Sequence, residues 1–297
     1  MNEHGPATPP EGHSLSQDDA GALYYYLELA AALRRTRLST PTSGAASPPH
    51  AGALVRDLLS VASAYALLPQ DLVAPAPFTC GAALVRGIPC SRLQRARGLP
   101  LQPFDIADLS VGLLPPTRDH GAALSPPVGA ALAAKQRGDR RVVLAHLAAS
   151  ACDAGDFHEA LNMAAVTRVA LVVLVEREDA APGRTVEGRS DPTARAAGYG
   201  LPARHVEAAD VSAVYSTIRD ATTSARDECQ CIVIDASVSS VHPLESDAAD
   251  SRAASEQPPR AFLAYMLDRR LITEGDAMAL DRRIQAELAG SDEAADR

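Results

Sequence analysis

The spacing of apolar residues changes near residue 140, from a helical pattern to an alternation of strands and helices. Before that point, apolar side chains recur every three or four residues, which is typical of amphipathic helices. This spacing predicts four helices, at residues 16–37, 54–66, 81–86 and 128–137. Prolines interrupt residues 98–127, so this stretch is predicted to be a long, irregular connection.

Beyond residue 140, short continuous apolar runs alternate with helical segments. The predicted strands are 141–147, 170–175 and 231–234. The predicted helices are 157–168, 210–226, 259–267 and 273–288. Uninterrupted apolar strands are typical of a parallel sheet that is covered on both sides. The pattern therefore predicts an α/β fold, a doubly wound parallel sheet with helices on both faces.

The predicted elements belong to one domain behind a short leading segment. Residues 1–15 are rich in proline, glycine and histidine and have no periodicity, so a disordered lead is expected there. Residues 16–297 are expected to form a single domain that ends in helices. Ser16 is the expected N-cap of the first helix. The run Tyr24-Tyr25-Tyr26 within that helix is expected to serve ordinary helix packing.

Charge and cysteine content narrow the classes of function. The 297 residues carry a net charge of −9, so no basic face for a nucleic acid is expected. No apolar run approaches the roughly 20 residues that span a bilayer, and the N-terminus does not resemble a signal or transit peptide. The 5 cysteines are odd in number and have no framework spacing, so no disulfide framework is expected. We therefore expect a cytoplasmic protein.

Several sequence blocks, in a fixed order, resemble one family. Residues 155–166, Gly-Asp-Phe-His-Glu-Ala-Leu-Asn-Met-Ala-Ala-Val, are almost identical to a run in bacterial alpha subunits of pyruvate and branched-chain 2-oxo-acid dehydrogenases. Further blocks match in register, at residues 69–73, 81–84, 86–89, 128–135, 195–202 and 210–215. Across residues 16–289, the chain thus resembles the alpha subunit of the thiamine-diphosphate-dependent first component of these complexes.

The resemblance implies a thiamine-diphosphate-binding fold and a set of partners. The implied reaction is the oxidative decarboxylation of a 2-oxo acid, with transfer of the acyl group to a lipoyl arm. The implied cofactors are thiamine diphosphate and magnesium, and the cofactor itself supplies the carbanion chemistry. The implied partners are a beta subunit, in an assembly that also contains a second copy of this chain, and an acyltransferase core.

The positions that hold the cofactor in the family carry different residues here. The family has a Gly-Asp-Gly turn after one strand and an Asn-Asn pair after the next. Counting from the matching block places the turn at Ala148-Ala149-Ser150 and the pair at Arg177-Glu178. Carboxylate and amide oxygens bind a hard cation, and glycines let the backbone approach a phosphate. Ala149 therefore stands where the metal-binding aspartate is implied.

Three further family positions are also altered. A Tyr-Arg pair that reaches the diphosphate corresponds to Pro77-Phe78. A late Tyr-Arg followed by His-Ser, in a loop over the active site, corresponds to Ser239-Ser240 and, loosely, to His242-Pro243, where His242 is the implied catalytic residue. A helix glutamate near the dimer contact corresponds to Asp57.

Two functional interpretations follow from these replacements. Cofactor ligands have become alanine, proline and phenylalanine while framework residues remain, so the first is a non-catalytic or regulatory paralogue with lost or weakened cofactor binding. The second is an active dehydrogenase subunit with an atypical site. There, Glu178 would bind the metal, backbone amides near Ser150 would hold the diphosphate, or Arg177 would neutralise it.

The retained block also contains residues that suggest other roles. Cys152, Asp153 and His158 are the chemical types of a nucleophilic site, but a structural role is expected for His158. Glu159 and Asn162 are expected to fix their helix against the sheet or against a partner subunit.

Overall fold

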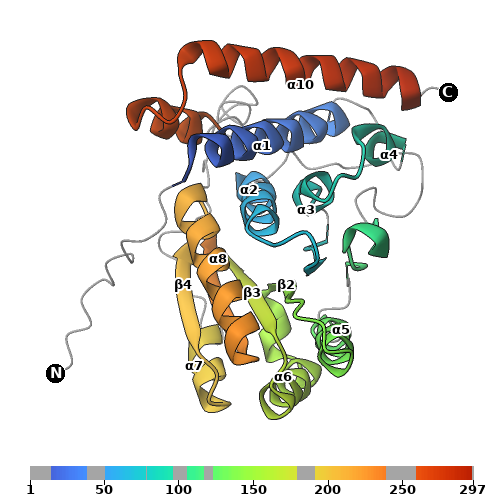
Figure 1. The fold of residues 1–297 in the computed structure, drawn as a ribbon, viewed down its shortest axis with the longest axis vertical. Coiled ribbons are helices and arrows are strands. Elements are labelled where there is room, and N and C mark those ends of the chain that lie inside the picture. The colour runs from blue at the N-terminus through green and yellow to red at the C-terminus, as the bar shows by residue number, and fades with distance from the viewer. Residues whose placement is uncertain are drawn as a thin grey trace.

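The computed structural model describes residues 15–38, 51–77, 79–95, 106–116, 123–178, 191–238 and 259–295. Five parallel strands form one sheet in the order β1-β2-β3-β5-β4 (Figure 1). They are β1 (Leu72–Ala74), β2 (Val143–Ala148), β3 (Leu171–Glu178), β4 (Ala203–Glu207) and β5 (Cys231–Val238). The predicted α/β fold with a parallel sheet is confirmed.

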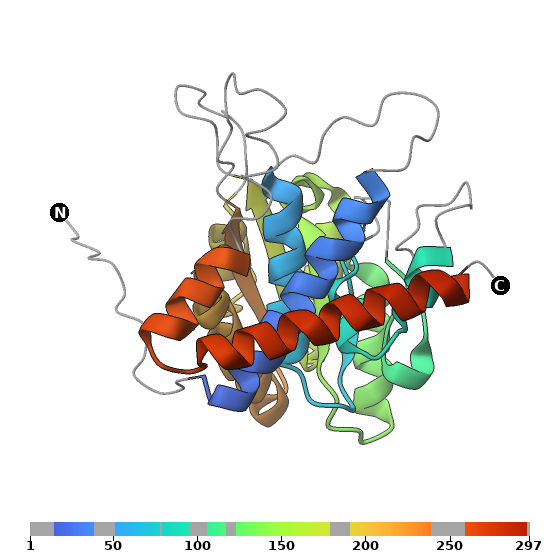
Figure 2. The same ribbon diagram turned by 90° about the horizontal axis from the view of Figure 1, so that it is seen from above.

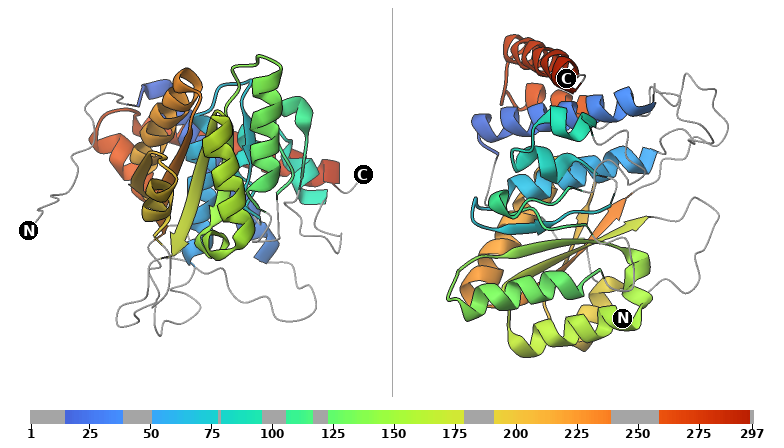
Figure 3. Two further views of the ribbon diagram at one scale, coloured as in Figure 1. Left: turned by 90° about the horizontal axis from the view of Figure 1, so that it is seen from below. Right: turned by 90° about the vertical axis from the view of Figure 1, so that its right-hand side faces the viewer.

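Helices cover both faces of the sheet, as the right-hand view of Figure 3 shows. On one face, α2 (Ala51–Tyr65) and α8 (Val211–Glu228) pack on the strands. In the next layer, α1 (Gln17–Leu38) and α3 (Gly81–Val85) pack on α2, and α4 (Cys90–Arg95) packs on α10 (Glu274–Ala295). Beyond them lie residues 259–268, which are helical, and α10. The other face packs against α5 (Ser125–Gln136), α6 (Gly155–Thr167) and α7 (Pro192–Gly198).

The alternation of side chains along β3 explains its continuous apolar run. Val172 and Leu174 belong to the core on the α1, α2 and α8 side, whereas Val173 and Val175 belong to the core on the α5 and α6 side. All four side chains are fully buried. A strand covered on both faces has no position where a polar side chain reaches water, so it is apolar throughout.

The helix boundaries also follow the local chemistry of the chain. Ser16 caps α1, because the backbone N–H of Asp19 donates to Ser16 Oγ at 3.1 Å and that hydroxyl donates to the Asp19 carboxylate at 2.7 Å. Tyr24 and Tyr25 are buried on α1 and donate to the carboxylates of Asp281 and Glu287. These bonds hold α10 across α1, as Figure 2 shows, which confirms the packing role of the tyrosine run.

The structure contains several elements that the apolar pattern does not predict. Spacing of apolar residues did not predict α4, α7, β1 or β4. Residues 1–14 of the expected disordered lead lie outside the described residues, and a single domain over residues 16–297 stays a prediction. None of the helices described is both long enough and apolar enough to cross a bilayer.

A buried carboxylate joins three elements at the amino end of the sheet. Asp71, which precedes β1, is fully buried. Its carboxylate accepts from the backbone N–H groups of Leu68 and Val142, both at 2.9 Å, and from Arg226 Nη2 of α8 at 2.6 Å. It therefore fixes the start of β1 against the residue before β2 and against α8.

We predict that Asp71→Ala lowers the free energy of unfolding by about 3–5 kcal/mol, because it leaves a buried guanidinium and two backbone donors without their acceptor. The control is Asp227→Ala, which removes the partner of Arg140 in an ion pair with 72% and 59% exposed side chains. That variant is expected to lose at most about 1 kcal/mol. Urea unfolding followed by circular dichroism measures both, and equal losses would contradict the role of Asp71.

Candidate functional site

The family positions for the cofactor lie at the carboxyl ends of two neighbouring strands. Ala149 follows β2 and begins a short 3-10 helix, η3 (Ala149–Asp153), that leads into α6. Because Ala148 lies opposite Glu176 in the parallel ladder, Ala149 lies beside the end of β3, where Arg177 and Glu178 stand. This is the edge at which ligands bind in open α/β sheets. Ala149 is partly exposed and Ser150 is exposed.

Three of the predicted site residues are not placed with their side chains. Phe78 and His242 lie outside the described residues. Glu178 is the last residue of β3, but its side chain is likewise outside the described part. The proposals for these residues therefore stay predictions.

Arg177 is paired with an aspartate from the adjacent strand. Its Nε lies 3.0 Å from Asp235 Oδ1 and its Nη2 lies 2.9 Å from Oδ2, so the guanidinium and the carboxylate meet as two forks. Asp235 is buried on β5 and lies 3.4 Å from Nδ1 of His205. The Arg177 side chain remains 29% exposed. Asp235 thus neutralises the charge that could otherwise face a diphosphate.

A second polar network is buried on the opposite face of the same strand ends. Ser63 Oγ of α2 lies 3.0 Å from His146 Nε2, and His146 Nδ1 lies 3.1 Å from the carboxylate of Glu176. Arg56 of α2 approaches the other oxygen of Glu176 at 3.3 Å. The order serine, histidine, acid resembles a nucleophilic triad, but Ser63 is 0% exposed and no substrate can reach it. The network instead fastens α2 to β2 and β3.

The described residues do not fit a divalent metal at this edge. Magnesium is held by oxygen ligands, typically carboxylates and phosphates. Ala149 presents a methyl group, and Arg177 presents a cation that is already paired. Within the described ranges, no group of three or more histidine, cysteine, aspartate or glutamate side chains is arranged to hold an ion. No step of a reaction can therefore be derived through a bound metal.

Cys152, Asp153 and His158 do not form a nucleophilic site. Cys152 is fully buried, and burial raises the pKa of its thiol to about 12. Arg195 of α7 donates to Asp153 at 2.7 Å and also contacts the ring of His158. Nδ1 of His158 lies 2.9 Å from the hydroxyl of Tyr199. These contacts fasten α7 to α6, which supports a structural role for His158.

Glu159 and Asn162 require a correction. Both are exposed on the outer side of α6. The buried face of that helix is formed by Phe157, Ala160, Leu161 and Ala164 instead. Glu159 and Asn162 therefore do not fix α6 against the sheet, and contact with a partner subunit is the remaining part of the expectation.

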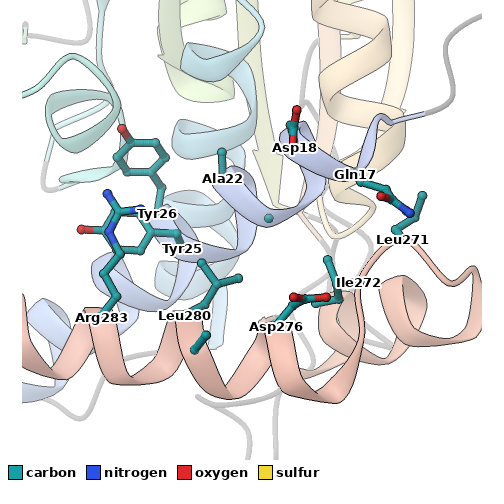
Figure 4. Close-up of a pocket in the computed structure, with 12 residues that line it drawn as sticks. Gln17, Asp18, Ala22, Tyr25, Tyr26, Leu271, Ile272, Asp276, Leu280 and Arg283 are labelled. Atoms are coloured by element: carbon teal, nitrogen blue, oxygen red, sulfur yellow. The ribbon is translucent and has the colours of Figure 1, made fainter.

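An open groove lies elsewhere, between α1 and α10 (Figure 4). Its volume is about 640 Å³, and its walls include Asp18, Tyr25, Asp276 and Arg283. All of its lining residues come from α1, from α10 or from residues 271 and 272, and none comes from the end of a strand. The groove is therefore separate from the candidate cofactor edge.

Comparison with known proteins agrees with this geometry. A parallel sheet with its ligand positions at the carboxyl edge defines the class of doubly wound α/β proteins. Residues 110–256 match the family model of the dehydrogenase E1 component. This part of the chain belongs to that family, and the chain is related to its alpha subunits.

Individual relatives show the same relationship. The 3-methyl-2-oxobutanoate dehydrogenase subunit alpha of Mycobacterium tuberculosis is 31% identical over 180 residues, which are 58% of this chain and 47% of the relative. The pyruvate dehydrogenase E1 component subunit alpha of Rhizobium meliloti is 27% identical over 183 residues, 58% of this chain and 53% of the relative. The match thus spans about half the length of these curated relatives.

We predict that one of the five thiols reacts with an aromatic disulfide reagent at pH 8 in the folded protein. None of the five cysteines forms a disulfide, and only Cys229 is exposed. Burial raises the pKa of Cys90, Cys152 and Cys231 to about 12, so at pH 8 these thiols stay protonated and unreactive. Cys229→Ser is expected to abolish the fast reaction, and urea should expose the other four. Fast labelling of Cys152 would contradict its burial and would support a role as a nucleophile.

Proposed function

We propose that this chain is an alpha-subunit-like member of the dehydrogenase E1 family that does not use magnesium and thiamine diphosphate, and so is a non-catalytic or regulatory paralogue. One observation carries the proposal: the carboxyl edge of β2 and β3 presents Ala149 and the Arg177–Asp235 pair. A cation in this place would meet a methyl group and a guanidinium, and neither is a metal ligand.

The pattern of what is retained supports the proposal. Most residues of the central strands β2, β3 and β5 are apolar and buried, and the glycine that begins α3 allows close packing. A Cβ on Gly81 would lie 2.7 Å from the backbone nitrogen of Val61, so only glycine fits there. Residues that fold the chain are kept while ligand positions have changed, which is the outcome expected when selection acts on the fold and not on the cofactor.

The same proposal assigns partners to the chain. Its relatives are named as alpha subunits, so we propose that it assembles with a beta subunit and, through it, with an acyltransferase core. The 2-oxo acid would then be handled by the assembly and not by this chain alone. A cytoplasmic location agrees with five cysteines that form no disulfide.

Ligand-induced stabilisation tests the proposal. A ligand that binds only the folded state stabilises it by about 2.7 kcal/mol at 100 times its Kd. We predict no shift in the urea midpoint with thiamine diphosphate and magnesium, either for the chain alone or with a purified beta subunit. An authentic alpha–beta dehydrogenase serves as the positive control.

A parallel titration in EDTA separates the two interpretations. Micromolar binding that requires magnesium would overturn the proposal in favour of an active subunit with an atypical site. Micromolar binding that persists in EDTA would also overturn it, and would instead favour neutralisation of the diphosphate by arginine. The variant Arg177→Asn then tells whether that guanidinium is responsible.

A further inference from the structure

The groove between α1 and α10 carries opposite charges at its two ends, as Figure 4 shows. Arg283 of α10 lies beside Tyr25 of α1 at one end, whereas Asp18 of α1 and Asp276 of α10 lie at the other. The groove volume of about 640 Å³ is within the range of small-molecule sites, roughly 300–1,000 Å³. The groove therefore has the size and the polar ends of a binding site.

The cationic end of the groove is oriented by an aromatic ring. The Arg283 guanidinium lies over the ring of Tyr25, with its Cζ atom 4.4 Å from the ring centroid. Tyr25 is buried and its hydroxyl donates to the Glu287 carboxylate, so the ring is held in place. Within the described ranges, Arg283 makes no ion pair. A stacked guanidinium that has no carboxylate partner can bind one as a two-pronged donor.

The acidic end of the groove combines carboxylates from two helices. Oδ2 of Asp276 accepts from the hydroxyl and from the backbone N–H of Thr273, at 2.7 and 2.9 Å. These bonds hold the pKa of the Asp276 carboxyl below its usual range, so it is ionised at neutral pH. Asp18 lies in the first turn of α1 and is exposed. Acids are common at helix N-termini, but here two helices place theirs at the same end of one groove, which makes that end negative.

The two charged ends are two helical turns apart. Asp276 and Arg283 are separated by seven positions on α10, which corresponds to roughly 10 Å at about 1.5 Å per residue. Between the ends, Ala22 of α1 and Leu280 of α10 line the groove with apolar side chains. Three residues of an extended peptide span roughly the same 10 Å. A ligand that satisfies both ends therefore needs a positive group, an apolar middle and a negative group, in that order.

We propose that this groove binds an elongated zwitterion with an apolar middle, namely a short apolar peptide with free termini. The ammonium group of the peptide would meet the carboxylates of Asp18 and Asp276, and its terminal carboxylate would meet the Arg283 guanidinium. Its apolar side chain would cover Leu280. This site is independent of the coenzyme, because none of the residues that line the groove comes from the end of a strand.

Calorimetric titration with three forms of one peptide tests the site. The probes are alanyl-leucyl-alanine with free termini, its N-acetyl form and its C-terminal amide. We predict that the free peptide binds the full chain and that each blocked form binds at least about tenfold more weakly. Acetylation removes the ammonium charge and amidation removes the carboxylate charge, and hydrogen bonds to charged groups are the stronger ones.

Two variants connect each peptide terminus to its residue in the groove. In Arg283→Gln, the free peptide and its amide are expected to bind equally weakly, because the guanidinium no longer distinguishes them. In Asp18→Asn, the loss caused by N-acetylation is expected to become smaller. The matched control is Arg282→Gln, which changes the neighbouring exposed arginine of α10 and should keep the wild-type affinity, since Arg282 does not line the groove. Urea midpoints verify that each variant folds.

Three outcomes would overturn the peptide site. The first is no heat of binding with roughly 10 mM free peptide, ten times the Kd of a millimolar ligand. The second is equal affinity of the wild-type chain for all three peptide forms, which would show an apolar surface without recognition of the termini. The third is an equal loss in Arg282→Gln and Arg283→Gln, which would show a general effect of charge. None of these results bears on the coenzyme titration.

Discussion

The Arg177–Asp235 pair is the constraint on which the chemistry of this protein depends. It places a fixed positive charge, already neutralised by a buried carboxylate, at the end of the central strand. Removing Asp235 would deprive the partly buried Arg177 side chain of its two-pronged acceptor. Removing Arg177 would leave the buried Asp235 carboxylate with only His205, at 3.4 Å, and each change is costly. The pair therefore makes the edge stable without an exogenous ion, and also makes it a poor place for one.

The strand ends show how one edge can lose a ligand site and stay well folded. Polar residues at the ends of parallel strands must find partners when no ligand satisfies them. On the α7 side of the sheet, the Asp235 carboxylate pairs with Arg177. On the α2 side, the Glu176 carboxylate contacts both His146 and Arg56. Both networks join separate elements of the fold. Polar groups at this edge thus hold the protein together, a role that requires no cofactor.

The apolar pattern predicted most of the fold because its causes are local. Runs such as β3 and the helical spacing of α8 are set by which neighbours face the core, so the sequence shows them directly. Strand β4 was missed because it lies at the sheet edge, and only Val206 among its five residues is buried. The partner of Arg177 lies 58 residues further on, and Ser63 and His146 are 83 residues apart. Such pairs are brought together by the fold, so the local spacing of residues cannot predict them.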